Sequence, residues 1–314
     1  MQRTPAIIIG IVAVVIAAVI GFILISGSPD EPEPSPTPSA EASPSASPSV
    51  EASPTFAADL LDRRWTVLYV GTDQNAERED RDEPLNTDAL MLVSLSADQS
   101  ELTLVSLPRD TVDVPLEDGS VYASKINRLY RDRGMDALVG AMEALFGVPI
   151  DGHVLLDMDD FSSLVDAVGM IEVSPDAPLV DPIVNLDLEA GPQEIDATTT
   201  LGYVRTRVDQ DYGRMGRQQE VVLALVERLT DAETDVDLRS VLDGLDSLET
   251  DLPLDELPTM IELVRRASDA DVTRVLVEPP LITFEGDRGD GRGYILEPDV
   301  EAIRSEVQGL IGEE

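Results

Sequence analysis

Several arginines lie close together in the second half of the sequence, and their spacing suits an anion with more than one negative charge. Arg205 and Arg207 are two residues apart in a segment, 201–207, whose apolar and β-branched residues predict a strand. Side chains two apart on a strand leave the same face, so both guanidinium groups are expected to point the same way. Planar guanidinium groups hold phosphate oxygens through paired hydrogen bonds. The pair is therefore a candidate phosphate clamp.

A second group of polar residues opens the next element, a helix predicted over 214–229. Arg214 is three residues before Arg217 and four before Gln218, and these spacings place side chains on one face of a helix. Helix N-termini also attract anions. The connection from the predicted strand is short, so we expect all four arginines to lie close together.

The composition offers ion pairing as the alternative explanation for these arginines. The chain has 62 acidic and 22 basic residues and a formal net charge of −40, which excludes a nonspecific nucleic-acid surface. Asp209 and Asp211 lie between the two arginine groups and can neutralise part of their charge. Four like charges still repel one another unless an anion joins them, which favours phosphate binding. The absence of cysteine excludes disulfide and thiolate chemistry.

Five residues upstream add to the candidate site. Arg109 follows the end of a predicted strand, where sites in α/β folds usually form. Lys125, the only lysine, stands two residues before Asn127, which indicates a local need for a compact ammonium group, with chance as the alternative. Asp73 follows the first predicted strand and Asp88 precedes the second, so both carboxylates are expected at one sheet edge. There they can bind Mg²⁺ or Mn²⁺, although two aspartates in so acidic a chain can also meet by coincidence.

These residues require a framework of alternating strands and helices. Strands are predicted over 65–71, 89–95, 101–107, 151–156, 171–173, 201–207 and 272–277, the second and third of them as a hairpin. Helices are predicted over 135–146, 159–168, 214–229 and 298–310, with another hairpin around 286–293. We therefore predict an α/β fold in which a central mixed sheet is covered by helices on both faces.

The N-terminal part predicts a membrane anchor and a spacer. Residues 6–25 read AIIIGIVAVVIAAVIGFILI, an uncharged run of roughly the 20 residues that span a bilayer, with a cleaved signal peptide as the alternative. Arg3 precedes the run and acidic residues follow it, which favours a cytoplasmic N-terminus. The predicted organisation is a cytoplasmic stub and transmembrane helix over 1–26, a disordered Ser/Pro/Glu-rich linker over 27–57 and an extracytoplasmic domain over 58–314.

Six motifs in this chain resemble those of the LytR-CpsA-Psr family. They read GTD (71–73), TDALMLVSL (87–95), LVSLPRDT (104–111), KIN (125–127), YVRTR (203–207) and DYGRMGRQQ (211–219). The similarity covers a motif core over residues 65–230 and implies an α-β-α sandwich like that of the family. It also implies a phosphotransferase that moves an anionic glycopolymer from a polyprenyl-pyrophosphate carrier onto a peptidoglycan sugar, forming a phosphodiester bond at the cell membrane.

The resemblance also implies roles for single residues. The pyrophosphate would be bound by Arg109, Lys125, Asn127, Arg205, Arg207, Arg214 and Gln218, with magnesium on Asp73 and Asp88. Among these, Arg109 and Arg205 would stabilise charge in the reaction, while Asp211 or Asp110 would orient or deprotonate the attacking hydroxyl. One position departs from the family, which usually has an arginine where this chain has Asn86, so Arg78 or Arg81 is expected to compensate.

The carrier lipid would need an apolar tunnel between the sheet and one helical layer. Candidate lining residues are Leu138, Met142, Leu145, Phe146, Leu223 and Val226, although their helical spacing favours ordinary core packing. Two other functions use the same cations: a hydrolase that cleaves polyprenyl pyrophosphate with water, and a membrane-anchored binding protein or regulator of lipid-linked wall precursors.

Overall fold

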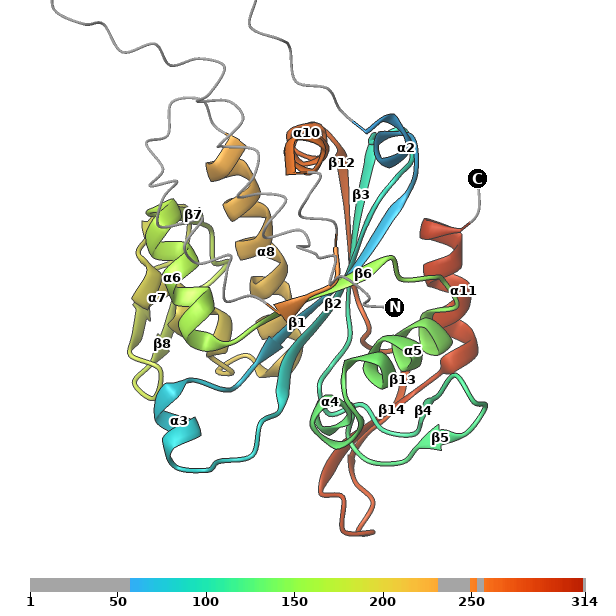
Figure 1. Cartoon of the computed structure of the whole chain (residues 1–314). Coiled ribbons are helices and arrows are strands. Elements are labelled where there is room, and N and C mark those ends of the chain that lie inside the picture. The colour runs from blue at the N-terminus through green and yellow to red at the C-terminus, as the bar shows by residue number, and fades with distance from the viewer. Residues whose placement is uncertain (1–56, 231–248, 253–256, 313–314) are drawn as a thin grey trace, which may run out of the picture.

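A six-stranded mixed sheet forms the centre of the molecule. The computed structural model describes residues 57–230, 249–252 and 257–312 (Figure 1). The strand order is β11-β6-β1-β2-β3-β12. These strands are β1 (Trp65–Thr72), β2 (Thr87–Leu95), β3 (Glu101–Ser106), β6 (Gly152–Leu156), β11 (Glu249–Thr250) and β12 (Asp271–Leu276). β1, β2 and β3 pair antiparallel, whereas β6 runs parallel to β1 and β12 parallel to β3, so the predicted mixed sheet and the hairpin of its second and third strands are confirmed.

Helices cover both faces of this sheet, as predicted. One layer contains α2 (Ala58–Leu61), α6 (Met158–Val168), α7 (Ala197–Arg205), α8 (Gln210–Thr230) and α10 (Leu257–Ala267). The other contains α4 (Leu129–Arg133), α5 (Met135–Phe146) and α11 (Val300–Ile311), preceded by the 3-10 turn η1 (Ile126–Arg128). In Figure 1 the sheet runs between α6, α7 and α8 on one side and α5 and α11 on the other.

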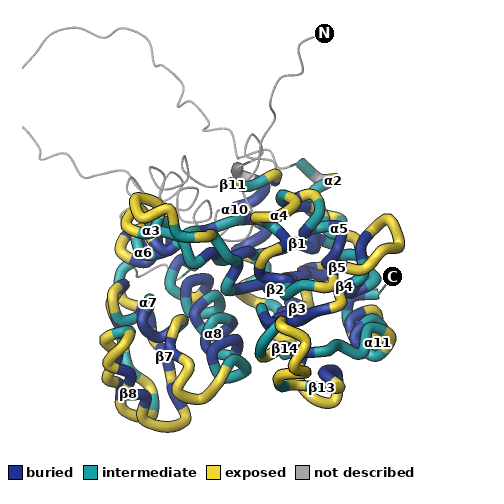
Figure 2. Tube along the Cα trace, turned by 90° about the horizontal axis from the view of Figure 1, so that it is seen from below, coloured by how far each residue is buried: buried dark blue, intermediate teal, exposed yellow. Residues whose placement is uncertain are grey.

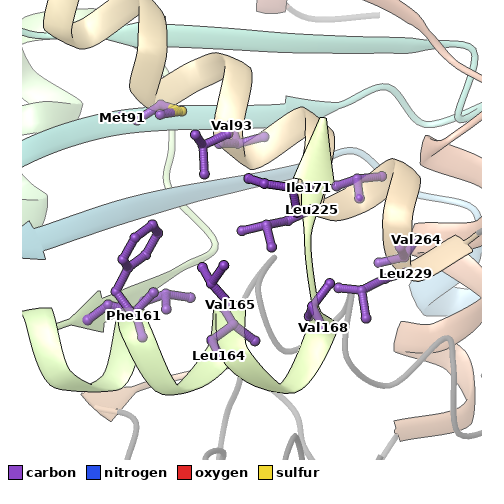
Figure 3. Packing of buried hydrophobic residues seen from close by; sticks show 14 of the residues in the cluster. Met91, Val93, Phe161, Leu164, Val165, Val168, Ile171, Leu225, Leu229 and Val264 are labelled. Atoms are coloured by element: carbon purple, nitrogen blue, oxygen red, sulfur yellow. The ribbon is translucent and has the colours of Figure 1, made fainter. Parts of the chain in front are cut away.

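Two hydrophobic cores follow from the alternation of side chains along the strands. On β1, Val67 contributes to the core beneath α6, α7 and α8, and its neighbour Leu68 contributes to the core beneath α5 and α11. Phe161 and Val165 of α6 are one helical turn apart and point toward Met91 of β2 (Figure 3). The cores fix both helical layers against the central strands.

Smaller elements surround the sheet at its ends. They are α3 (Ala76–Asp80), β4 (Val114–Pro115), β5 (Val121–Tyr122), β7 (Ile171–Val173), β8 (Leu179–Asp181), β9 (Leu186–Leu188), β10 (Gln193–Ile195), β13 (Ile282–Asp287) and β14 (Tyr294–Pro298). β13 and β14 form the hairpin predicted near the C-terminus. Figure 2 shows the central strands as largely buried, while these peripheral hairpins are exposed along much of their length.

The strand predicted over 201–207 is wrong, because residues 201–205 are the C-terminal half of helix α7 and residues 206–207 follow its end. Asp196 caps the helix, accepting a hydrogen bond from the backbone N–H of Thr199 at 2.8 Å. A Cβ atom on Gly202 would lie 2.9 Å from the carbonyl oxygen of Val184, so the glycine permits the helix to pack closely on its neighbour. The β-branched and aromatic residues that favoured a strand are used here in tertiary packing.

The N-terminal predictions concern residues that the structure does not describe. The expected anchor over 1–26 and all of the expected linker but Ala57 fall in this part of the chain. Across the ranges 57–230, 249–252 and 257–312, no helix has the length and apolar character needed to cross a bilayer.

Candidate active site

A polar pocket lies between the edge formed by β1 and β2 and the helices α7 and α8. It has a volume of about 330 Å³. Seven of the ten predicted site residues line it: Asp73, Asp88, Arg109, Arg205, Arg207, Arg214 and Gln218. Arg78 is also in the lining, together with apolar residues of β1, α6, α7 and α8. Segments far apart in the sequence therefore meet at one site, as predicted from their residue types.

Asp88 is the centre of the arginine group in this pocket. Its carboxylate accepts a hydrogen bond from Arg109 and lies 3.3 Å from Nη2 of Arg207 and 3.5 Å from Nη1 of Arg214. Asp211 lies behind this group, 3.5 Å from Nε of Arg207 and 3.3 Å from Nη2 of Arg214. The two aspartates hold three guanidinium groups together, which limits their mutual repulsion in the absence of an anion.

Arg214 is the most deeply buried of these cations. Its side chain is 2% exposed, and its Nε and Nη2 atoms are buried without a hydrogen-bond partner. Burial lowers the pKa of its guanidinium group to about 10, which leaves it charged at neutral pH. A buried cation with unused hydrogen-bond donors is expected to gain stability from an anion placed in the pocket.

Arg205 stands apart from the ion pairs. It is exposed at the end of α7 and, within the described residues, it makes no ion pair or hydrogen bond. Because α7 is helical, Arg205 and Arg207 do not share a strand face as predicted. They still reach one pocket, since the chain leaves the helix in an extended conformation at Thr206.

The pocket carries an excess of positive charge. Its five arginines are Arg78, Arg109, Arg205, Arg207 and Arg214. The same lining holds three aspartates, Asp73, Asp88 and Asp157, so two positive charges remain, and Asp211 outside the lining neutralises one of these. The site has this excess although the chain as a whole has a net charge of −40. A pyrophosphate diester, which has one ionised oxygen on each phosphorus, is an anion that this excess would attract.

The position where the family usually has an arginine is part of a hydrogen-bonded corner. Asn86 donates from its backbone N–H and its side-chain amide to Asp73, at 2.7 and 3.1 Å. Arg78 pairs with the same carboxylate at 2.9 Å and lines the pocket. Arg81 instead pairs with Glu77 and Glu83 and is not in the pocket lining. Of the two expected replacements, Arg78 is the one that the structure places at the site.

Lys125 and Asn127 lie next to the pocket rather than in its lining. The ammonium group of Lys125 pairs with Asp110 at 2.9 Å. The backbone N–H of Asn127 donates to the carbonyl oxygen of Arg109 at 3.2 Å, while its side-chain oxygen is buried and unpaired. Both residues support the segment that carries Arg109.

Arg217 has a structural role that the sequence analysis did not predict. Although it was expected to join the phosphate cluster, it is buried on another face of α8. It donates to the carbonyl oxygens of Tyr203 and Thr206 at 2.9 and 2.7 Å, and it pairs with Asp209. Arg217 therefore fixes the connection between α7 and α8, which positions Arg205 and Arg207.

An apolar cavity of about 50 Å³ adjoins the polar pocket. Val222 lies in the walls of both, and Val226 and residues of β1, β2 and α10 complete the apolar lining. Of the other candidate tunnel residues, Leu138, Met142, Leu145 and Phe146 belong to the core on the opposite face of the sheet. For those four residues the core-packing alternative is confirmed.

The sequence that builds this fold and pocket matches the model of a known protein family. The LytR_cpsA_psr family model matches residues 37–298, well over half of the chain. The chain belongs to this family. The match extends beyond the predicted motif core on both sides.

Two individual members of the LytR-CpsA-Psr family are similar to this chain in sequence. The probable cell wall biosynthesis protein LcpB of Corynebacterium glutamicum is 36% identical over 180 residues, 53% of this chain and 42% of LcpB. TagV of Bacillus subtilis, named a polyisoprenyl-teichoic acid–peptidoglycan teichoic acid transferase, is 26% identical over 264 residues, 80% of this chain and 65% of TagV. The chain thus spans less than two thirds of the length of either relative.

Solved structures of family members share the fold described above. The crystal structure of B. subtilis TagV aligns with a TM-score of 0.64 and 23% identity, covering 81% of this chain and 99% of the chain in that crystal structure. A structure of TagT bound to LIIa-WTA aligns with a TM-score of 0.62 and 22% identity, covering 84% of this chain and 96% of TagT. These alignments support the α/β fold with its central mixed sheet.

The hydroxyl and carboxylate oxygen atoms at one edge of the arginine pocket fit a divalent cation. Thr72 and Thr87 are paired in register across β1 and β2, and their hydroxyl groups are buried without hydrogen-bond partners. Each directly precedes a pocket aspartate, Asp73 or Asp88. Mg²⁺ commonly binds one or two carboxylates and completes its coordination with water and phosphate oxygens. In the part of the chain that the structure describes, no group of three or more acidic, histidine or cysteine side chains offers a protein-only metal site.

The two threonines were missed by the sequence analysis. Their signal in the sequence is the Thr-Asp dipeptide, which occurs at 72–73 and again at 87–88. The strand register brings the two dipeptides together, because it places the two threonines opposite each other.

Proposed function

We propose that this chain is a phosphotransferase that moves an anionic glycopolymer from a polyprenyl-pyrophosphate carrier to a peptidoglycan sugar. The observation that carries the proposal is the pocket in which arginines outnumber aspartates. Arg205 has no ion-pair or hydrogen-bond partner among the described residues, and Arg214 has unused donors. Family membership and the names of TagV and its relatives support the same reaction class. The apolar cavity next to the pocket supports a carrier with a lipid tail.

The arginines would act by binding the pyrophosphate and stabilising charge during transfer. Arg78, Arg109, Arg205, Arg207 and Arg214 would surround the two phosphate groups, and Gln218 would add a neutral donor. Negative charge moves to the bridging oxygen as the phosphate bond breaks, and the guanidinium groups stabilise it. The leaving group is then polyprenyl phosphate.

Asp73 and Asp88 would hold Mg²⁺ or Mn²⁺ at the edge of this site. The metal would supply further charge neutralisation on the phosphate oxygens. For Asp88 to bind it, the three arginines that now surround its carboxylate would turn toward the phosphates. Asp211 or Asp110 would orient or deprotonate the attacking sugar hydroxyl.

We further propose that the run over residues 6–25 anchors the chain in the cell membrane, with its N-terminus in the cytoplasm and the pocket outside. The acceptor and the lipid-linked donor are then both within reach. The carrier substrate is itself a membrane lipid, so anchoring keeps enzyme and donor on the same surface.

The test uses the purified full-length chain with a polyprenyl-pyrophosphate-linked glycan and uncrosslinked peptidoglycan glycan chains. We expect the glycan to become covalently joined to peptidoglycan, and chelation of divalent metal with EDTA to reduce the rate. Release of phosphorylated glycan alone would identify a hydrolase. Binding without turnover would identify a binding protein or regulator and would contradict the proposed enzymatic function.

A further inference from the structure

Two tyrosines and a glutamate form a platform beside the arginine pocket. Tyr212, in the first turn of α8, donates its hydroxyl to Oε2 of Glu285 on β13 at 2.7 Å. Tyr294 begins β14, on the other strand of the same hairpin, and is 50% exposed. Figure 2 shows this hairpin next to α8, with much of its length exposed. We call these three residues the tyrosine platform.

The tyrosine platform is joined directly to the segment that carries Arg109. The backbone N–H of Leu296 on β14 donates to the carbonyl oxygen of Asp110 at 3.1 Å, and Val112 donates back to Leu296 at 2.9 Å. On the other side, Tyr212 follows Asp211, whose carboxylate faces Arg207 and Arg214 in the pocket. The platform therefore borders the place where the phosphorus would lie.

The hydroxyl groups of the platform face carboxylates. Burial, followed by the hydrogen bond to Glu285, raises the pKa of Tyr212. Burial, followed by the charges of Glu285, Asp211 and Asp110, raises the pKa of Tyr294. Both hydroxyls consequently stay protonated and remain hydrogen-bond donors throughout the physiological pH range.

This chemistry differs from that of the arginine pocket. Carboxylates that surround neutral hydroxyls repel a phosphate, but they accept hydrogen bonds from the hydroxyls of an uncharged sugar. A half-exposed aromatic ring offers an apolar face with a polar edge, which suits a sugar ring with its C–H and O–H groups. The platform is thus suited to a neutral, hydroxyl-rich ligand at a short distance from a phosphate site.

The tyrosine platform continues into a second groove. Tyr212 also lines a groove of about 820 Å³ between α8 and the segment 174–180, with Tyr203, Arg274 and Glu278 in its walls. This volume lies within the range of about 300–1,000 Å³ found for ligand sites. A polymeric acceptor would therefore find space for neighbouring sugar units on one side of the platform.

We propose that Tyr212, Tyr294 and Glu285 form the acceptor subsite, which binds a peptidoglycan sugar and presents its hydroxyl to the pyrophosphate. The inference rests on the proposed transferase function and adds the residues that select the acceptor. The sugar oxygen forms a bond to the glycan-bearing phosphorus, and the bond from this phosphorus to the bridging oxygen breaks. The hydroxyl proton passes to Asp211 or Asp110, and the bridging oxygen leaves with polyprenyl phosphate.

The experiment measures acceptor and donor separately with the full-length protein. Tyr294→Ala and Glu285→Gln are compared with wild type for KM toward uncrosslinked peptidoglycan glycan chains and for binding of the polyprenyl-pyrophosphate-linked glycan. We expect the acceptor KM to rise about tenfold, the loss expected from one aromatic contact or one hydrogen bond to a charged group. Donor binding should change less than about twofold, because neither residue lines the arginine pocket.

Tyr130→Phe is the matched control. Tyr130 on α4 also donates to a glutamate, Glu249, at 2.9 Å, but it is not in the lining of the arginine pocket or the second groove. It should leave both measurements unchanged. Thermal melting of all variants checks folding, which Tyr294→Ala should not disturb because the side chain is half exposed.

Two results would overturn the proposal. One is an unchanged acceptor KM in both platform variants, and the other is a loss of donor binding equal to the loss of acceptor use. If the wild-type chain catalyses no transfer, the proposed function fails, and direct binding of the glycan chains then decides the subsite. In that case equal binding by wild type and Tyr294→Ala would exclude the platform as a sugar site.

Discussion

The arginines of the pocket differ in how far each is already neutralised. Arg109 is hydrogen-bonded to Asp88, whose charge raises the pKa of Arg109 against the effect of burial. Arg205 has no ion-pair or hydrogen-bond partner among the described residues. An incoming phosphate must compete with Asp88 for Arg109, whereas it finds Arg205 free. Removing Arg205 should therefore affect binding and catalysis with little effect on folding.

We predict that Arg205→Ala lowers the transfer rate by about 10²–10³-fold, the loss found when one preorganised donor to a developing charge is removed. Arg109→Ala should reduce the rate similarly but should also lower the melting temperature, because Asp88 loses a partner. Rates are measured by glycan transfer, and stability by thermal denaturation.

The control for these variants is Arg81→Ala. Arg81 is half exposed and pairs with Glu77 and Glu83 outside the pocket. It should retain the wild-type rate. Near-normal transfer by Arg205→Ala would remove the phosphate-clamp assignment, whatever the behaviour of Arg109→Ala.

At the scale of elements, the site depends on the joint between α7 and α8. Arg217 bridges it by binding two carbonyl oxygens at the end of α7 and the carboxylate of Asp209 in the connection. Gln219 attaches α8 to the sheet, donating to the hydroxyl of Ser106 and the carbonyl oxygen of Val275, each at 2.9 Å. These buried polar contacts orient the face of α8 that bears Arg214 and Gln218.

Arg217→Met is expected to lower the free energy of unfolding by about 2–4 kcal/mol, because it leaves the carbonyl oxygens of Tyr203 and Thr206 buried and unpaired. Denaturant unfolding measures this change. Pyrophosphate binding by the folded fraction should also weaken, since Arg207 lies in the connection that Arg217 holds.

The comparison for this change is Arg265→Ala, which removes an exposed arginine that pairs with Glu262 on α10. Such a surface pair contributes at most about 1 kcal/mol. If Arg217→Met were as stable as Arg265→Ala, other contacts would hold the joint between α7 and α8, and the role given to Arg217 would be wrong.

At the scale of the whole molecule, the net charge of −40 works against an anionic donor. A negative protein gives such a substrate no long-range electrostatic attraction, and the local field of five arginines is screened within about 8 Å at physiological ionic strength. Confinement to one membrane surface can replace electrostatic attraction, since tethering gives effective concentrations of about millimolar. The proposed anchor would then raise the rate of transfer by making encounters between the enzyme and its donor more frequent.

We therefore predict that deleting residues 1–26 reduces attachment of glycopolymer to the wall in cells much more than it reduces transfer on soluble short-chain donors in vitro. Wall-bound polymer in cells and transfer rate in solution are the two measurements. A replacement anchor of unrelated apolar sequence should restore attachment. Full attachment by an untethered, exported chain would contradict this role.

The sequence by itself determined the types of most elements and the identity of the pocket cations. Period-two and helical patterns are local, so β1, β2, β3, α5 and α6 could be predicted to within about two residues. The arginines and aspartates of the pocket could be identified from the sequence, because a cluster of like charges requires a ligand or oppositely charged partners in any fold. Helix α7 could not be predicted from the sequence, because Tyr203 and Val204 favour a strand locally. Packing against Val184 and α8 makes the segment helical.

Tertiary structure alone decided which charged groups meet. Arg217 and Gln218 are neighbours on α8 and both donate to carbonyl oxygens of α7, yet only Gln218 lines the pocket, because adjacent residues of a helix point in different directions. The same holds for Tyr212 and Tyr294, which are far apart in the chain; Tyr212 lies in the motif over 211–219, whereas Tyr294 lies in none of the six motifs. A contact between distant segments depends on how the elements pack. The types of the side chains determine only which interaction is possible once the packing has brought them together.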